Sequence, residues 1–144
     1  MRSGVLVLLG TAGFIAGCSP ATPTDTLSAT FQQSKLCQSQ VPIQYSALAN
    51  TPMAGVSAPP ITIEMSNDGG WCAFNLSTFM GGGAYPADVH LTRAPAHGQV
   101  ATRKLQRTTQ VAYKPATGFT GADEFTVVNQ TLGMARGVTV TVTE

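Results

Sequence analysis

Two histidines and seven acidic residues are among the side chains of this sequence that could hold a metal ion or move a proton. His90 and His97 are separated by Pro95, a spacing that favours placement on different elements or faces instead of a shared metal site. Calcium loops need several carboxylates in a short span, and Asp123–Glu124 is the one adjacent acidic pair. We therefore expect no bound metal ion and no cofactor.

The sequence patterns of common enzyme sites are also missing. There is no Gly-x-Ser-x-Gly motif for acyl transfer. The glycine triplet at residues 81–83 lacks the Lys-Ser/Thr that completes a phosphate-binding loop, so we interpret it as the tip of a flexible loop. A pair of facing glycosidase carboxylates is improbable among so few acids. We expect a protein without enzymatic activity or catalytic residues.

Cys18 stands where a short apolar stretch ends and a Ser-, Thr- and Pro-rich stretch begins. A branched apolar residue and two small residues come directly before it, and the four together resemble the lipobox of bacterial lipoproteins: Ile15, Ala16, Gly17 and Cys18. The resemblance implies that residues 1–17 are a signal peptide cleaved before Cys18 and that the Cys18 thiol carries acyl chains. Ser19, directly after the cysteine, favours the outer membrane over the inner membrane where both exist.

Two or more acyl chains hold a protein stably on a bilayer, whereas one holds it weakly. The implied location is therefore the cell envelope, with the membrane as a partner through the N-terminal acyl chains. Residues 18–36 are polar and without periodicity, and we expect a lipidated N-terminus and flexible tether there. Residues 37–144 are then one domain.

If Cys18 is acylated, Cys37 and Cys72 remain as a pair of the three cysteines. In an oxidising envelope compartment they are expected to form a disulfide. A two-cysteine metal or redox site is the alternative, but the C-x-x-C spacing and a nearby histidine are missing.

Composition favours an all-β extracytoplasmic domain with a modest core. The chain has eight basic and seven acidic residues, and Arg2 would leave with the signal peptide. This balance argues against nucleic acid, which needs a basic surplus. Thr, Val, Ala and Gly are abundant and charged residues make up only 10% of the chain.

Alternating apolar and polar residues predict strands. The runs at 61–66 and 71–77 flank Asn-Asp-Gly-Gly, and we predict that they form a hairpin. Further strands are expected near 41–45 and at five later runs: 88–93, 98–104, 109–115, 123–129 and 136–143. Seven or eight short strands are typical of an immunoglobulin-like antiparallel β-sandwich.

Residues 86–144 resemble the bacterial immunoglobulin-like and cadherin-like repeats of secreted adhesins. The matching positions are Pro95, His97, Gly98, Val100, Val111, Tyr113, Pro115, Gly118, Phe119, Gly121, Asp123 and Phe125. Their chemistry suggests a scaffold: Asp123 can accept backbone N–H bonds in a turn, and Phe119 can close the end of a core. Those repeats usually occur in tandem, whereas this sequence carries one.

Five basic residues fall between Asp88 and Asp123 with no acid among them. Solvated residues on an edge explain this pattern, and so does a patch for an acidic polymer or protein. We take Arg103, Lys104 and Arg107 as candidate binding residues, together with Tyr85 beside the glycine triplet.

The sequence thus predicts a lipid-anchored envelope protein that binds a protein or surface polymer, and an accessory subunit of a membrane assembly is one form that this role can take. A periplasmic lipoprotein for a small ligand or metal, and an inhibitor of a secreted hydrolase, are the alternatives.

Overall fold

The computed structural model describes residues 25–28, 30–42 and 59–144. The signal peptide, Cys18 and most of the strand expected at 41–45 lie outside these residues. Val41 and Pro42, which are described, are not part of a strand.

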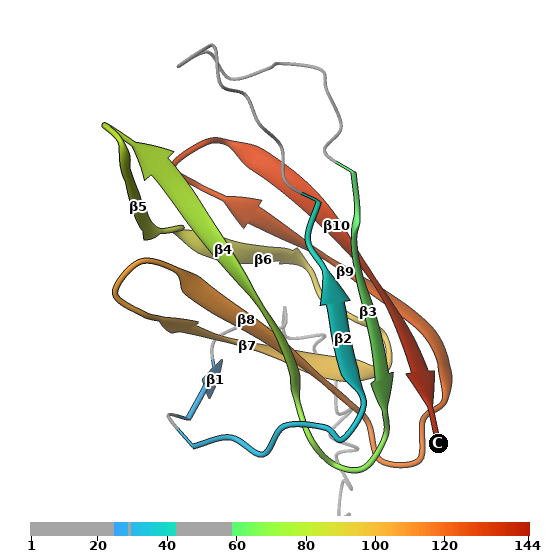
Figure 1. Ribbon diagram of the computed structural model, residues 1–144. Coiled ribbons are helices and arrows are strands. Elements are labelled where there is room, and N and C mark those ends of the chain that lie inside the picture. The colour runs from blue at the N-terminus through green and yellow to red at the C-terminus, as the bar shows by residue number, and fades with distance from the viewer. Residues whose placement is uncertain (1–24, 29, 43–58) are drawn as a thin grey trace, which may run out of the picture.

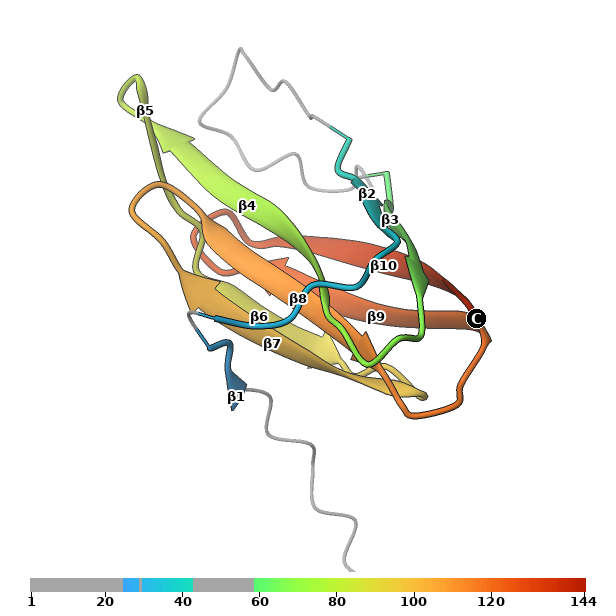
Figure 2. The same cartoon turned by 60° about the horizontal axis from the view of Figure 1, so that its bottom comes forward.

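The described residues form two five-stranded sheets that pack face to face (Figures 1 and 2). The first sheet contains, in spatial order, β1 (Asp25–Thr26), β7 (Gly98–Lys104), β8 (Thr109–Pro115), β4 (Cys72–Met80) and β5 (Gly83–Pro86). The second contains β2 (Cys37–Gln40), β3 (Ile61–Ser66), β10 (Met134–Thr143), β9 (Gly121–Asn129) and β6 (Val89–Arg93). The predicted all-β sandwich is confirmed.

The core lies between the sheets because each strand turns its apolar positions to the same side. Along β3, Ile61, Ile63 and Met65 are buried while Thr62 and Glu64 are exposed. Burying one such aliphatic side chain contributes roughly 1.5–3 kcal/mol. The other strands supply the remaining core: Cys72, Phe74, Val100, Val111, Tyr113, Phe125, Val127, Val138, Val140 and Val142.

The predicted hairpin of the runs at 61–66 and 71–77 is wrong. β3 pairs with β2 and β10, whereas β4 pairs with β8 and β5 in the other sheet. The turn at 67–71 therefore carries the chain from one sheet to the other. An alternating strand needs only a partner face to cover its apolar side, and a facing sheet serves as well as a neighbouring strand.

Two strand pairs are parallel, which the antiparallel sandwich expected from the sequence did not include. β3 runs parallel to β10 over six residue pairs, from Ile61–Val138 to Ser66–Thr143. β1 runs parallel to β7 over two pairs. β3 and β10 can run parallel because they are joined through β4 to β9, a connection long enough to bring the chain back to the starting end of the sheet.

The predicted tether of residues 18–36 extends too far toward the C-terminus, because residues 25–28 and 30–36 are part of the fold. We call residues 25–28 and 30–36 the N-terminal strap. It begins with β1, which pairs with β7 at the edge of the first sheet, and the segment after β1 crosses the outer face of that sheet (Figure 2). Leu27 is only 3% exposed, and its backbone N–H donates to the carbonyl of Thr102. The strap covers a second, smaller apolar cluster of Leu27, Ala101 and Ala112, with Phe31, Trp71 and Ala73 packed against it. The folded unit therefore begins by residue 25.

The glycine triplet forms a tight turn between β4 and β5, and β5 is a strand that the sequence analysis missed. Gly81 and Gly82 have φ angles of 58° and 82°, which suit a two-residue hairpin turn and favour glycine. β5 then leads through Ala87 and Asp88 into β6 of the opposite sheet. Figure 1 shows the β4–β5 hairpin reaching beyond the rest of the sandwich.

Candidate functional site

Several residues of the pattern noted in 86–144 form a hydrogen-bonded cluster centred on the Asp123 carboxylate. Asp123 is 6% exposed. One of its oxygens accepts the backbone N–H of Ala96 at 2.9 Å, and the other accepts the backbone N–H of His97 at 2.9 Å. The hydroxyl of Tyr113 donates to the carboxylate at 2.9 Å. The prediction that Asp123 accepts backbone N–H bonds is confirmed.

The ionisation of this pair follows from its contacts. Burial alone raises the pKa of Asp123, but hydrogen bonds from His97, Ala96, Glu124 and Tyr113 outweigh it and hold the pKa below its usual value. Burial, and then the hydrogen bond to Asp123, raise the pKa of the Tyr113 hydroxyl. Asp123 is therefore an anion and Tyr113 a neutral donor at neutral pH. A tyrosine held in its neutral form is suited to structure more than to proton transfer.

Phe119 and His97 close the same end of the sandwich. Their rings stack with centroids 4.4 Å apart. The side-chain amide of Asn67 donates to the carbonyls of Ala116 and Phe119, at 2.8 and 2.9 Å. These contacts fasten the β8–β9 loop to the β3–β4 turn. His97 and Phe119, both positions of the pattern in 86–144, thus help to hold loops together.

A disulfide joins the two sheets through Cys37 on β2 and Cys72 on β4, with an S–S distance of 2.04 Å. This confirms the predicted pairing. Cys18 is the one cysteine of the sequence outside this pair.

Arg103, one of the candidate binding residues, is occupied by the N-terminal strap. Its guanidinium donates to the carbonyl of Ser28 at 3.1 Å and to the side-chain oxygen of Gln110 at 2.7 Å. It also lies 5.8 Å from the ring centroid of Phe31. These contacts give Arg103 a structural task.

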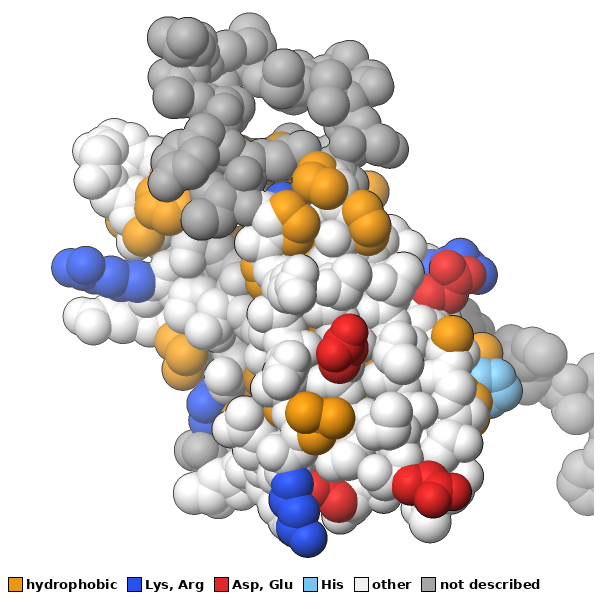
Figure 3. All heavy atoms as spheres, turned by 45° about the vertical axis from the view of Figure 1, so that its right-hand side comes forward, with side chains coloured by type: hydrophobic (Ala, Val, Ile, Leu, Met, Phe, Trp, Pro, Cys, Tyr) orange, Lys and Arg blue, Asp and Glu red, His pale blue; other side chains and the backbone are white. Residues whose placement is uncertain are grey.

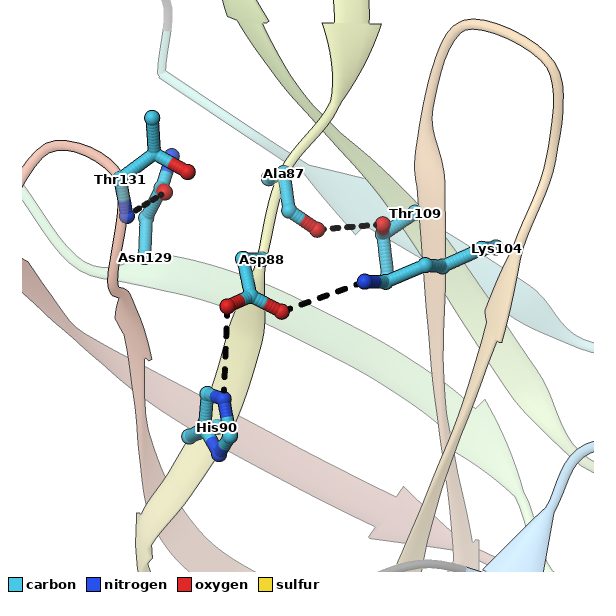
Figure 4. Close-up of polar contacts among 7 residues, drawn as sticks. All are labelled: Ala87, Asp88, His90, Lys104, Thr109, Asn129 and Thr131. Atoms are coloured by element: carbon cyan, nitrogen blue, oxygen red, sulfur yellow. Dashed lines mark hydrogen bonds and ion pairs between the residues drawn. The ribbon is translucent and has the colours of Figure 1, made fainter.

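Lys104 belongs to an ion-pair cluster with Asp88 and His90 (Figure 4). Its ammonium lies 3.2 Å from one Asp88 oxygen, and Nε2 of His90 lies 3.6 Å from the other. The hydrogen bond from Lys104 lowers the pKa of Asp88. Nearby, the Thr109 hydroxyl donates to the carbonyl of Ala87 where the chain passes from β5 to β6. The cluster links strands of both sheets, and its exposed pairs contribute little to stability.

Arg107 and Tyr85 lie at one end of the sandwich, where three hairpins meet. The Ser77 hydroxyl on β4 donates to the carbonyl of Arg107 in the β7–β8 turn. The Asn129 amide, beside the β9–β10 turn, donates to the Thr78 hydroxyl on β4. These bonds place the β4–β5, β7–β8 and β9–β10 tips at the same end, as Figure 1 shows. We call this surface the hairpin end.

The hairpin end collects large apolar side chains on the surface. Phe79 is 78% exposed, Tyr85 51% and Met80 49%, all on the β4–β5 hairpin. Leu105 in the β7–β8 turn and Leu132 in the β9–β10 turn are 37% and 38% exposed. Leu36 is the one other exposed large apolar side chain among the described residues. Exposed apolar residues gathered at one place commonly mark a binding surface.

Other parts of the described surface show fewer features of a binding or catalytic site. Figure 3 shows a face on which charged side chains are separate groups in a mostly uncharged surface. Within the described ranges, no group of three or more His, Cys, Asp or Glu side chains could hold a metal ion. Over the same part of the chain, none of the elements is a helix long and apolar enough to cross a bilayer.

Comparison with models of protein families, with curated proteins and with solved structures finds no match to this chain.

Proposed function

We propose that this protein is a non-enzymatic binding module held on a bacterial cell envelope by acyl chains at Cys18, with the outer membrane as the favoured site. The observation that carries the proposal is that two of the three cysteines are bonded to each other while the third follows a lipobox-like sequence. Cys37 and Cys72 are joined to each other, and Cys18 is the cysteine that follows the lipobox-like residues 15–17. A disulfide is typical of compartments outside the cytoplasm.

The hairpin end supports a binding role for the domain. It combines exposed Phe79, Met80 and Tyr85 with the exposed side chain of Arg107. Aromatic, Met and Arg side chains are enriched in protein interfaces. Of the four candidate residues, Tyr85 and Arg107 remain the best placed for a protein or surface-polymer partner, because Arg103 and Lys104 are engaged within the fold.

Metabolic labelling tests the anchor. The full chain is produced in a lipoprotein-processing bacterium supplied with labelled palmitate, and the mature N-terminal peptide is weighed by mass spectrometry. We expect label on the protein, an N-terminus at Cys18 with the added mass of the acyl groups, and recovery in the membrane fraction. Cys18→Ser should abolish the label. An unmodified Cys18 in the wild-type protein would overturn the proposal.

Partner capture tests the binding role. The acylated protein is cross-linked in intact cells and recovered with its partners. We expect one or a few envelope components, whether protein, polymer or lipid, lost in Tyr85→Ser with Arg107→Ser and kept in Leu36→Ser, whose side chain is exposed elsewhere. Equal recovery from all variants would place the binding surface away from the hairpin end.

A further inference from the structure

We propose that the hairpin end rests on the surface of an anionic lipid bilayer, the same bilayer that carries the acyl chains. This rests on the acylation of Cys18 proposed above. It names the bilayer itself, in place of a protein or a surface polymer, as the partner of the hairpin end. This second membrane contact, made by the folded domain, sets how the module is oriented on the membrane.

The chemistry of the hairpin end suits an interface of water and lipid. Phe79 and Met80 sit beside the two-residue glycine turn of the protruding β4–β5 hairpin, and Tyr85 lies on the returning strand. Membrane-interface segments present aromatic and aliphatic side chains with Lys or Arg beside them. Arg107 is exposed in the adjoining turn.

The charge of this end fits anionic headgroups. Among the described residues, Asp88 is the acidic residue near this end, and its carboxylate already lies 3.2 Å from the Lys104 ammonium. Arg107 then adds a positive charge beside the apolar tips. Anionic lipids attract such residues by about 1 kcal/mol per Lys or Arg near the surface.

The length of chain between Cys18 and the fold allows both contacts at once. Asp25 lies seven positions after Cys18, and seven fully extended steps of ~3.3–3.6 Å span at most about 25 Å. Asp25 is in register with Ala101 on β7, and β7 runs from there toward the β7–β8 turn. Leu105 lies four residues beyond Ala101, about 14 Å at ~3.4 Å per residue. Leu76 is level with Lys104 across Thr109, so Met80 lies about seven residues beyond the level of Asp25, or roughly 24 Å. Because β1 is parallel to β7 and points toward the hairpin end, the segment before it must turn back and extend almost fully to make both contacts.

Photo-cross-linking from the lipid tests this orientation. The acylated full chain is reconstituted in vesicles of phosphatidylethanolamine and phosphatidylglycerol that contain a photoreactive phospholipid, and cross-linked peptides are identified by mass spectrometry. We expect cross-links in peptides containing Phe79 to Tyr85 and Leu105. Phosphatidylcholine vesicles, or high salt, should lower their yield severalfold, because the attraction to headgroups is lost or screened.

Variants separate the contact from the anchor. Phe79, Met80 and Tyr85 replaced together by Ser should remove the cross-links at the hairpin end, and Leu36→Ser is the matched control. Arg107→Ser should lower the yield about fivefold, the equivalent of one headgroup attraction, and Lys35→Ser should not. Each variant is accepted after its thermal unfolding is shown to match the wild type.

The outcomes also distinguish this inference from the proposed function. An unacylated protein that does not float with vesicles overturns the anchor. An acylated protein that floats with them but is cross-linked equally all over its surface, or away from the hairpin end, overturns the contact. The contact is also overturned if the hairpin end is covered by an added envelope protein and not by the bilayer alone, because its partner is then a protein.

Discussion

Cys72 and Tyr113 are register partners on neighbouring strands β4 and β8, and each reaches across to the opposite sheet. Cys72 is bonded to Cys37 on β2, and the hydroxyl of Tyr113 donates to Asp123 on β9. A covalent link and a charge-assisted hydrogen bond therefore cross the sandwich side by side. Both links lie at the end opposite the hairpin tips.

Tyr113→Phe should lower the free energy of unfolding by about 1.5–3 kcal/mol, the usual value of a hydrogen bond to a charged group. Urea unfolding at neutral pH measures this loss.

Replacing Cys37 and Cys72 by Ser should lower the free energy of unfolding by roughly 3–4 kcal/mol according to the loop-entropy model, since their sequence separation is 35. Because the two links are adjacent, the combined variant should depart from the sum of the two effects. Strict additivity would show that the links act independently.

Asp123 should make the protein sensitive to acid. Its folded-state pKa is lowered, so its stabilising effect is present above the unfolded-state value of about 3.9 and is lost as the pH falls through the lower folded value. Asp123→Asn should destabilise the protein at pH 7 and flatten the part of the stability profile below about pH 4. Unfolding in urea across this pH range checks the prediction. Parallel profiles of variant and wild type would contradict it.

Gly98 should tolerate no side chain. A Cβ at this position would overlap the ring of Tyr113, which is fully buried. Gly98→Ala should therefore cost about 1–3 kcal/mol, as overpacking of a core does. Gly137→Ala on β10 is the matched control, because a Cβ there meets no atom within 4 Å. Thermal unfolding of the two variants measures the difference, and an equal loss would show that strand glycines matter for another reason.

The N-terminal strap should detach before the sandwich unfolds. Leu27→Ala removes its main apolar contact, and Arg103→Ser removes its bonds to Ser28 and Gln110. Trp71 is the one tryptophan of the sequence and packs under the strap, so its emission should shift to longer wavelength in both variants. Proteolysis should then cut ahead of Cys37 while the rest of the domain stays intact. An unchanged Trp71 spectrum would contradict this order of events.

Much of the fold could be predicted from the alternation of side chains. The β3 run with Ile61, Ile63 and Met65, and the five later runs, are strands in the structure, and Cys37 and Cys72 are bonded as expected. What failed was pairing. Local alternation says which face of a strand is buried, but not whether its cover is a neighbouring strand or a facing sheet, and β3 and β4 took the second arrangement.

The candidate site was only partly predictable. Tyr85 and Arg107 lie at the hairpin end, whereas Arg103 and Lys104 have internal partners that are distant in the sequence, Ser28 and Asp88. Phe79 and Met80 were missed. Phe79 breaks the alternation of β4, because it has the outward parity of Asn75 and Ser77 while polar Thr78 takes the inward position. That break was a local signal, but nothing local shows that the hairpin extends beyond the sandwich there.

By itself, the sequence determined the longer strands, the sandwich class and the cysteine pair, because side-chain alternation and disulfide chemistry depend on residue types and spacing. The tertiary structure alone decided that Asp123 and Tyr113 bind across the sheets, that the strap covers Trp71, and that three hairpin tips share one end. Those relations join residues far apart in the chain, and only the packing of two sheets brings them within contact distance.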